Sequence, residues 1–249
     1  FPGMRQQLRR MTLAGNTTME HLLMGWPCNG LGSWPFHPVS LGGNTLVASD
    51  LFGDALPASC TLTVLPGFST YVGADIASGL IACAMDRTDT ESLFLDLGTN
   101  GEMALGTGQG ILVASTAAGP ALEGGQLRCG MSSVPGAICS VTWNGSVPSV
   151  RTISDSPPRG LCGTGVIEAM AGLVEGIVDR HGTLREPWFT RGFPLAQGAD
   201  DAPVVLTQAD IRQIQMAKSA IRAGISVLLR TAGLREDDVK PIWLAGGFG

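Results

Sequence analysis

The sequence predicts an α/β protein in which mixed sheets are flanked by helices. A short apolar strand at residues 11–14 passes through a glycine-led turn into a helix, which is the layout of an α/β crossover. Three strands follow one another between residues 92 and 115. A long helix that starts at Thr207 carries apolar residues at helical spacing and leads to a last strand at 240–245, which we expect to be buried.

Composition excludes several classes of protein. Of the 249 residues, 44% are apolar and 15% are charged, which predicts a large buried core rather than a disordered chain. The net charge of −5 and the absence of a Lys/Arg run argue against a nucleic-acid partner. No apolar run approaches the roughly 18 residues of a membrane span, and no signal peptide is visible. The six cysteines lack C-x-x-C or zinc-site spacing and predict buried thiols in a reducing, cytoplasmic compartment: Cys28, Cys60, Cys83, Cys129, Cys139 and Cys162.

The first crossover offers polar side chains at its turn. Gly15 is followed by Asn16, Thr17 and Thr18, and then by an apolar helix that contains His21. These three residues are equally typical of helix caps and of a ligand-binding turn. We expect His21 to be packed or on the surface rather than catalytic.

The next segment, residues 25–70, is rich in Pro, Gly, Trp and Ser and predicts a loop-rich insertion with short strands. It is followed by a small-residue helix over 73–85, where Ala and Gly on several faces permit close approach of another helix. Asp75 lies near the start of that helix. It either faces a cleft or stabilises the positive end of the helix dipole.

The stretch from Ser92 to Leu105 predicts a hairpin with an acidic tip. An apolar strand runs into Asp96, and the backbone turns through Gly98, Thr99, Asn100 and Gly101 before a second strand leaves. Main-chain N–H groups at such a tip can hold phosphate oxygens, while the aspartate orients a hydrated Mg²⁺. An Asx turn without any ligand is the alternative.

Two more glycine-rich corners follow the hairpin. A loop-to-helix corner at 116–125 contains Gly119, Glu123 and Gly124, and its N–H groups could close over phosphates. Glu123 is a candidate acid or metal-shell residue, or a structural cap. The turn at 160–165 opens another helix and offers a weaker anion site.

The last helix and strand contribute three more candidates. Thr207 and Asp210 form a capping-box-like start, and Gly233 ends the helix. Lys218 lies on the apolar face, where it either extends to the rim or reaches a nucleotide ribose or phosphate. The strand then delivers Gly246 and Gly247, whose lack of side chains lets a flat ring or phosphate lie against the backbone.

The order of these parts resembles the second half of the actin, sugar-kinase and heat-shock-chaperone superfamily, whose actin-like ATPase fold is ribonuclease H-like. Asp96–Thr99 is similar to its second phosphate motif, and Leu244–Gly247 to its adenosine motif. Within the superfamily the chain is most similar to the C-terminal ATPase domain of the reductive activators of corrinoid proteins. The similar segments span nearly the whole chain: 14–19, 71–76, 96–102, 118–124, 129–131, 208–212, 217–225 and 245–249.

The resemblance implies a function for the intact protein. Members of this family couple hydrolysis of ATP, with Mg²⁺, to the reduction of a Co(II) corrinoid to Co(I) on a corrinoid protein or corrinoid-dependent methyltransferase. The electron passes through a [2Fe–2S] cluster in an N-terminal domain that we expect to be absent from this chain. Asp96 would hold Mg²⁺ through water, and Asp75 and Glu123 are weaker candidates for positioning the attacking water.

The resemblance also implies a domain division. Residues 1–90 would be the remainder of a first ATPase lobe, with the insertion at about 25–70, and residues 91–249 a second lobe that ends at the adenosine motif. Both ends look cut from a longer protein, so we expect the fold to be incomplete at both ends. Half of the nucleotide cleft would be missing, and the fragment alone would be a weak or inactive ATPase.

Three alternatives stay open. The chain could belong to a kinase of the same fold, or to an activator of 2-hydroxyacyl-CoA dehydratases. Those activators hold a [4Fe–4S] cluster between subunits, for which Cys129 is the position to watch, although it lacks a neighbouring second cysteine. A third alternative is a non-catalytic docking or dimerisation module, and a homodimer is compatible with each alternative.

Overall fold

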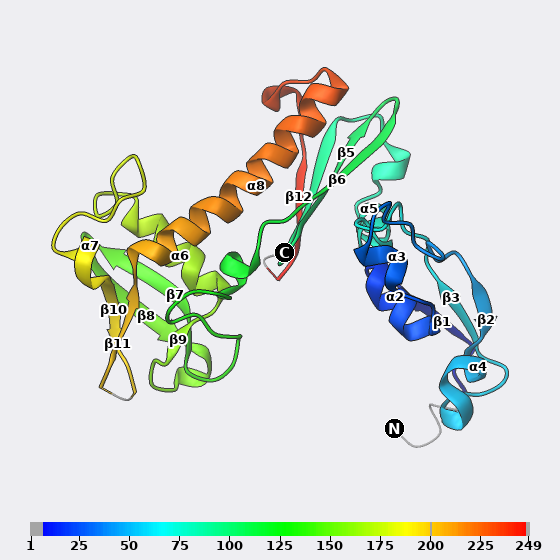
Figure 1. Ribbon diagram of the computed structural model, residues 1–249, viewed down its shortest axis with the longest axis horizontal. Helices are drawn as coiled ribbons and strands as arrows, with labels where there is room; N and C mark the ends of the chain where they lie inside the picture. The colour runs from blue at the N-terminus through cyan, green and yellow to red at the C-terminus, as the bar shows by residue number, and fades with distance from the viewer. Residues whose placement is uncertain (1–6, 200, 248–249) are drawn as a thin grey trace. The chain divides into compact units, whose positions relative to one another are not determined.

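The computed structural model describes residues 7–199 and 201–247, so the last two residues of the 245–249 motif lie outside the described part. The chain forms two compact units, which both contain separate stretches of sequence (Figure 1). The first unit consists of the residues up to Leu95, Glu102–Ser115 and Leu228–Trp243. The second unit consists of Asp96–Gly101, Thr116–Val227 and the residues from Leu244 onward.

A three-stranded sheet lies in the first unit. Its central strand β3 (Thr61–Val64) pairs in parallel with β1 (Arg10–Leu13) and antiparallel with β2 (Thr45–Val47). Leu62 and Val64 are fully buried, because alternate residues of a strand point to the same face. The short strands predicted within the segment 25–70 are thus confirmed as β2 and β3, and β3 is the central strand of the sheet.

Short helices accompany this sheet. They are α2 (Thr17–Met24), α3 (Asn29–Gly32), α4 (Ala48–Phe52) with the 3-10 turn η1 (Gly53–Ala55), and α5 (Ala74–Ala82) with the 3-10 turn η2 (Met85–Arg87). The small-residue helix predicted over 73–85 is thus confirmed as α5 and η2. A Cβ at Gly79 of α5 would overlap Cζ of Phe94, so glycine allows this close approach of the ring to the helix.

The predicted meander forms a four-stranded sheet. Strands β4 (Ser92–Leu97), β5 (Gly101–Thr107), β6 (Gly110–Thr116) and β12 (Ile242–Gly246) lie in the order β12-β4-β5-β6. The prediction that the last strand is buried is wrong, because Trp243 is 40% and Leu244 53% exposed. Because successive residues of a strand point to opposite faces of the sheet, the described residues cover neither face of β12, which also lies at the sheet edge beside β4.

The second unit contains a sheet of order β8-β7-β9, built from β7 (Ala137–Asn144), β8 (Val147–Thr152) and β9 (Gly160–Leu161). Helix α6 (Gly163–Leu173) packs on β7 (Figure 1). Gly172 makes room for the indole of Trp143, whose Nε1 donates to the backbone oxygen of Glu168 at 3.2 Å. The hairpin predicted at Asn144-Gly145 is confirmed.

The remaining elements complete both units. They are η3 (Pro120–Glu123), η4 (Ile153–Asp155), α7 (Trp188–Arg191), β10 (Phe193–Gln197), β11 (Pro203–Leu206), α8 (Gln208–Ala232) and η5 (Glu236–Asp238). Helix α8 buries Ile211, Ile214 and Ala217 in the core of the second unit. No helix among residues 7–199 and 201–247 combines the length and apolar character needed to cross a bilayer.

Candidate functional site

The tip of the β4–β5 hairpin is held by backbone hydrogen bonds. Strand β4 ends just after Asp96, and Gly98 N–H donates to the Asn100 oxygen at 3.0 Å. The backbone oxygen of Thr99 accepts from Gly119 N–H at 2.8 Å, which joins the tip to the loop that follows β6. The side chains of Thr99 and Asn100 remain exposed. The tip is therefore fixed in shape and presents its polar groups to solvent.

Glu123 lies directly beside the tip. The Thr99 hydroxyl donates to Glu123 Oε2 at 2.6 Å, a short bond of the kind that carboxylates form. The corner expected to begin a helix here is the single 3-10 turn η3, because Gly119 (φ 79°) and Gly124 (φ 83°) flank it with left-handed backbone. The loop thus places Glu123 at the tip, whereas Gly124 faces the backbone of Leu161 and Met131.

Gly246 completes the cluster from the end of β12. A Cβ at Gly246 would lie 2.6 Å from Asp96 Oδ1 and 2.6 Å from the Leu97 oxygen. Gly246 also has φ +86°, which side-chain-bearing residues rarely adopt. The structure therefore brings the D-x-G-T tip and the closing glycine motif together, although they are separated by about 150 residues of sequence.

The chemistry of these donors fits a hydrated Mg²⁺ bound with phosphate. Mg²⁺ is usually held by one or two carboxylates plus phosphates and water rather than by an all-protein cage. Asp96 supplies a carboxylate in a cradle that a Cβ at Gly246 would fill. Among the residues that the structure describes, no group of three or more His, Cys, Asp or Glu side chains could hold a metal.

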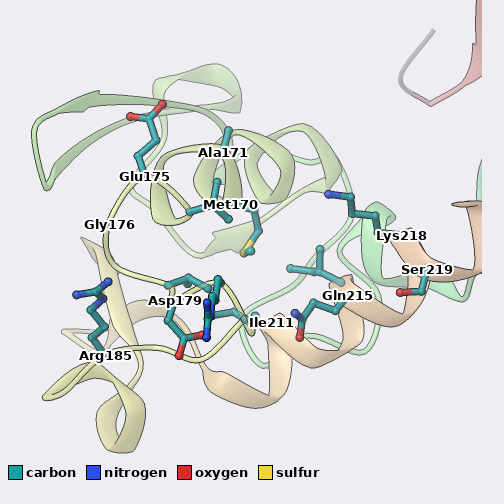
Figure 2. A pocket seen from close by; sticks show the side chains of 15 residues that line it. Met170, Ala171, Glu175, Gly176, Asp179, Arg185, Ile211, Gln215, Lys218 and Ser219 are labelled. Carbon is teal, nitrogen blue, oxygen red and sulfur yellow. The ribbon is translucent and has the colours of Figure 1, made fainter. Parts of the chain in front are cut away.

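Lys218 and Gly247 do not join this cluster through any close contact. Lys218 lies on α8 at the mouth of a separate cavity (Figure 2). Helix α8 nevertheless contacts the base of the hairpin one turn further on, since a Cβ at Gly101 would lie 3.2 Å from Ile221 Cγ1. A Cβ at Gly247 would meet nothing within 4 Å.

The other candidates lie in the first unit. Asn16 Oδ1 accepts from Met19 N–H at 2.9 Å, and the Thr17 hydroxyl donates to the Ser69 oxygen at 2.8 Å. Both side chains are therefore engaged in the local fold, which favours the capping alternative, while Thr18 is exposed. The N–H of Asp75 donates to the Gly15 oxygen at 3.2 Å, so the starts of α2 and α5 are joined.

Sequence patterns missed a buried carboxyl group beside these residues. Glu20 is 2% exposed and its Oε1 has no hydrogen-bond partner. Burial raises the pKa of Glu20 to about 7, the N–H of Gly15 lowers it, and the charge of Asp75 raises it further. Its neighbour His21 is packed, as expected: Nε2 accepts from Val39 N–H at 3.0 Å, which leaves Nδ1 to donate to the Thr17 oxygen at 2.8 Å.

The glycine-rich turn at 160–165 surrounds a thiol rather than an open anion site. Cys162 is 2% exposed at the start of α6. Burial raises the pKa of the Cys162 thiol, but hydrogen bonds from Thr164, Gly165 and Ser133 outweigh it and lower the pKa below its usual value. Cys129, the position considered for an intersubunit cluster, is a half-buried free cysteine.

Known protein families match nearly the whole chain. Residues 90–249 match the family model described as the C-terminal domain of RACo, the ASKHA domain, and residues 3–88 match the model of the RACo middle region. The chain is 32% identical over 255 residues to the corrinoid activation enzyme RamQ of Eubacterium limosum, covering 94% of this chain and 42% of that protein. It is 30% identical over 225 residues to the [Co(II) methylated amine-specific corrinoid protein] reductase of Methanosarcina barkeri, covering 81% of this chain and 40% of that protein.

A solved structure is also similar. The reductive activator for corrinoid,iron-sulfur protein matches with a TM-score of 0.84 and 31% identity, over 98% of this chain and 41% of that one. The chain thus spans about two fifths of the length of the relatives that it matches. Its fold is the actin-like ATPase (ASKHA) fold, as the sequence predicts. The chain belongs to the RACo family of reductive activators of corrinoid proteins.

Proposed function

We propose that this chain is the ATP-binding and ATP-hydrolysing part of a protein that drives reduction of a Co(II) corrinoid to Co(I). The observation that carries the proposal is the cluster of Asp96, Thr99, Glu123 and Gly246 in the second unit. A carboxylate, a hydroxyl and side-chain-free backbone meet there at the end of a sheet, which suits a Mg²⁺-bound polyphosphate. Two relatives, a corrinoid activation enzyme and a corrinoid protein reductase, support a corrinoid substrate.

Each residue of the cluster has a distinct proposed role. N–H groups of the tip face phosphate oxygens. Gly119 and Gly124 shape the loop beside the phosphates, since their own N–H groups donate to the Thr99 and Ala121 oxygens. Gly246 and Gly247 leave room for the nucleotide. Asp96 holds Mg²⁺ through water, and the ion neutralises charge that develops on the phosphates. Glu123 orients the attacking water once nucleotide displaces it from Thr99. Roles for Asn16, Thr17, Thr18, Asp75 and Lys218 in nucleotide binding are also proposed, and they have less support from local contacts.

The proposal extends to the electron and the partner. The single electron that reduces Co(II) to Co(I) would come from a [2Fe–2S] cluster in another part of the full-length protein. Residues 1–90 act as the remainder of the first ATPase lobe, and closing of the lobes on ATP changes docking on the corrinoid protein or corrinoid-dependent methyltransferase. Dimerisation of the activator is compatible with this scheme.

The test measures the ATP-dependent reduction of Co(II) to Co(I) by the full-length protein. The visible spectrum of the corrinoid reports the reduction. We expect Asp96→Ala to weaken Mg-ATP binding and to lower the rate by about 10²-fold or more, because it removes charge stabilisation of phosphoryl transfer. Glu123→Gln should lower the turnover by about 10²-fold with little change in ATP affinity, because it removes only the water-orienting group.

The matched control is Asp86→Ala. Asp86 is another acidic residue, which pairs with exposed Arg87 at 3.6 Å, and its loss should leave the reduction rate unchanged. Undiminished activity of Asp96→Ala would contradict the proposed role of Asp96 in holding Mg²⁺. Loss of ATP binding with no loss of reduction would favour the non-catalytic docking module instead.

A further inference from the structure

A cavity of about 790 Å³ lies in the second unit, between α6 with the loop that follows it and the first half of α8 (Figure 2). Its volume falls within the roughly 300–1,000 Å³ typical of small-molecule sites. The apolar part of its lining includes Met170, Val178, Ile211 and Ile214, and the sulfur of Met170 points into the space. None of the candidate residues of the hairpin tip lines it.

The walls of the cavity are fixed to one another. Gln208 of α8 accepts from Leu184 N–H at 2.7 Å and donates to the Gly182 oxygen at 2.9 Å. Arg212 donates to the His181 oxygen at 3.0 Å. These bonds tie the loop to α8 at several points, so the cavity is preformed, which lowers the entropic cost of binding.

The charge that the cavity offers to a ligand is positive. Lys218 extends its ammonium group toward the cavity, and the described residues give it no hydrogen bond or ion pair (Figure 2). Of the two lining carboxylates, Glu175 points away. Asp179 already accepts from His181 N–H and Thr183 N–H at 2.8 Å each, and the bond from Thr183 is the main cause of its lowered pKa.

We propose that this cavity binds a small organic anion with a flat apolar body, whose acidic group pairs with Lys218. The apolar walls of α6 and α8 accept the body, and the unpaired ammonium at the mouth accepts the charge. The residues that line the cavity include no cysteine and no histidine.

Two sources could supply this ligand chemistry. One is an aromatic carboxylic acid, which makes the cavity a site separate from the hairpin tip. The other is a nucleotide, whose base supplies the flat body and whose phosphate supplies the acidic group, because Lys218 lies one helical turn from Ile221, which contacts the base of the hairpin at Gly101. Only this second source rests on the proposed nucleotide-binding function.

The test uses the 249-residue chain and the fluorescent probe 1-anilinonaphthalene-8-sulfonate, an aromatic sulfonate. We expect one saturable site per chain. Lys218→Glu should weaken binding about tenfold, because it turns an attraction at the acidic group into a repulsion. Lys240→Glu, the same charge reversal at the other lysine, should leave the affinity unchanged. The uncharged probe N-phenyl-1-naphthylamine should bind equally to the unmodified chain and to both variants.

Two further measurements decide the location and the source. Met170→Trp should weaken binding, because the larger ring occupies part of the apolar space of the cavity. A thermal melting temperature close to that of the unmodified chain shows that this variant is folded. If 2-naphthoate alone displaces the probe, the cavity takes an aromatic acid. If adenosine monophosphate displaces the probe, the cavity takes a nucleotide. The proposal is overturned if the probe does not bind, if Lys218→Glu binds as the unmodified chain does, or if neither competitor displaces it. If 2-naphthoate displaces the probe and adenosine monophosphate does not, the proposed ATP site at the hairpin tip is not contradicted.

Discussion

At Glu20 the structure places an ionisable group where it cannot be hydrated. Its Oε1 has no partner, and a Cβ at Gly42 would lie 2.9 Å from its Oε2. A carboxylate in such a place is costly, because an unpaired buried charge loses its hydration without compensation. This explains why the pKa of Glu20 is raised to about 7 from the ordinary 4.5.

The raised pKa of Glu20 predicts a pH dependence of stability. The folded state binds the proton more tightly than the unfolded state, so the contribution of Glu20 to the free energy of unfolding is complete below pH 4.5 and is lost as the pH rises to about 7. We expect Glu20→Gln to stabilise the chain at pH 8, by about 1–3 kcal/mol, and to change little at pH 4.5. Urea unfolding at both pH values measures this. Glu175→Gln, at an exposed carboxylate, is the control, and an equal effect of both variants would contradict the prediction.

Gly246 is the residue whose lack of a side chain shapes the site. We expect Gly246→Ala to lower nucleotide affinity of the full-length protein about tenfold or more, because its Cβ would lie 2.6 Å from Asp96 Oδ1. The control is Gly145→Ala, which has the same left-handed strain (φ +58°) but nothing within 4 Å of its Cβ. Calorimetric titration with Mg-ATP separates the two, since only the clash at Asp96 should affect binding. Equal affinities for both variants would show that Gly246 is needed for backbone conformation alone.

At the scale of elements, one buried carboxylate fixes the start of helix α8. Asp210 is 3% exposed; its Oδ2 accepts from Thr207 N–H at 2.8 Å, and its Oδ1 from Arg128 N–H at 2.8 Å. The predicted capping box is therefore confirmed, and the same side chain also attaches the helix to a loop 82 residues earlier in sequence. The pattern of residues at 207–210 indicates the first role but not the second.

Asp210→Ala should destabilise the chain by about 1–3 kcal/mol, because it leaves the part-buried N–H groups of Thr207 and Arg128 without their acceptor. Asp210→Asn should cost less, since its amide oxygen still accepts one of these bonds. Asp238→Ala is the control, because Asp238 pairs with Arg235 at an exposed turn. Thermal unfolding followed by circular dichroism provides the measurement. A loss for Asp210→Ala no larger than for Asp238→Ala would show that the buried bonds contribute little.

At the scale of the whole molecule, the chain contains two units, and the candidate residues are divided between them. Asp96, Thr99, Glu123 and Gly246 belong to the second unit, whereas Asn16 and Asp75 belong to the first. The matched relatives are more than twice as long as this chain. A bilobal ATPase needs groups from both lobes around the nucleotide, so activity depends on more than the local geometry of one unit.

We therefore expect the 249-residue chain alone to bind Mg-ATP weakly and to hydrolyse it slowly or not at all. The full-length protein, assayed beside it, should bind at least about tenfold more tightly, because groups from both lobes then contribute. Calorimetric titration of both proteins measures the difference. Micromolar affinity of the short chain would contradict this expectation and would place the whole nucleotide site within these residues.

The sequence by itself determined the fold and the parts of the site whose signal is local. Glycine positions, helical spacing and the cap at Thr207 predict α5, α8 and the two hairpins, because backbone preferences and periodic burial act over a few residues. The order of the motifs was enough to identify the family. The hairpin tip and its candidate ligand Asp96 were found in the same way.

Only the tertiary structure decided which distant groups meet and which side chains are buried. The contacts of Asp96 with Gly246, of Thr99 with Glu123 and of Asp210 with Arg128 join segments far apart in sequence, and no local pattern encodes them. The same is true of burial: apolar β12 is exposed as an edge strand, whereas charged Glu20 is enclosed. The physical reason is that burial and electrostatics depend on what lies opposite a residue, which is set by packing of the whole unit.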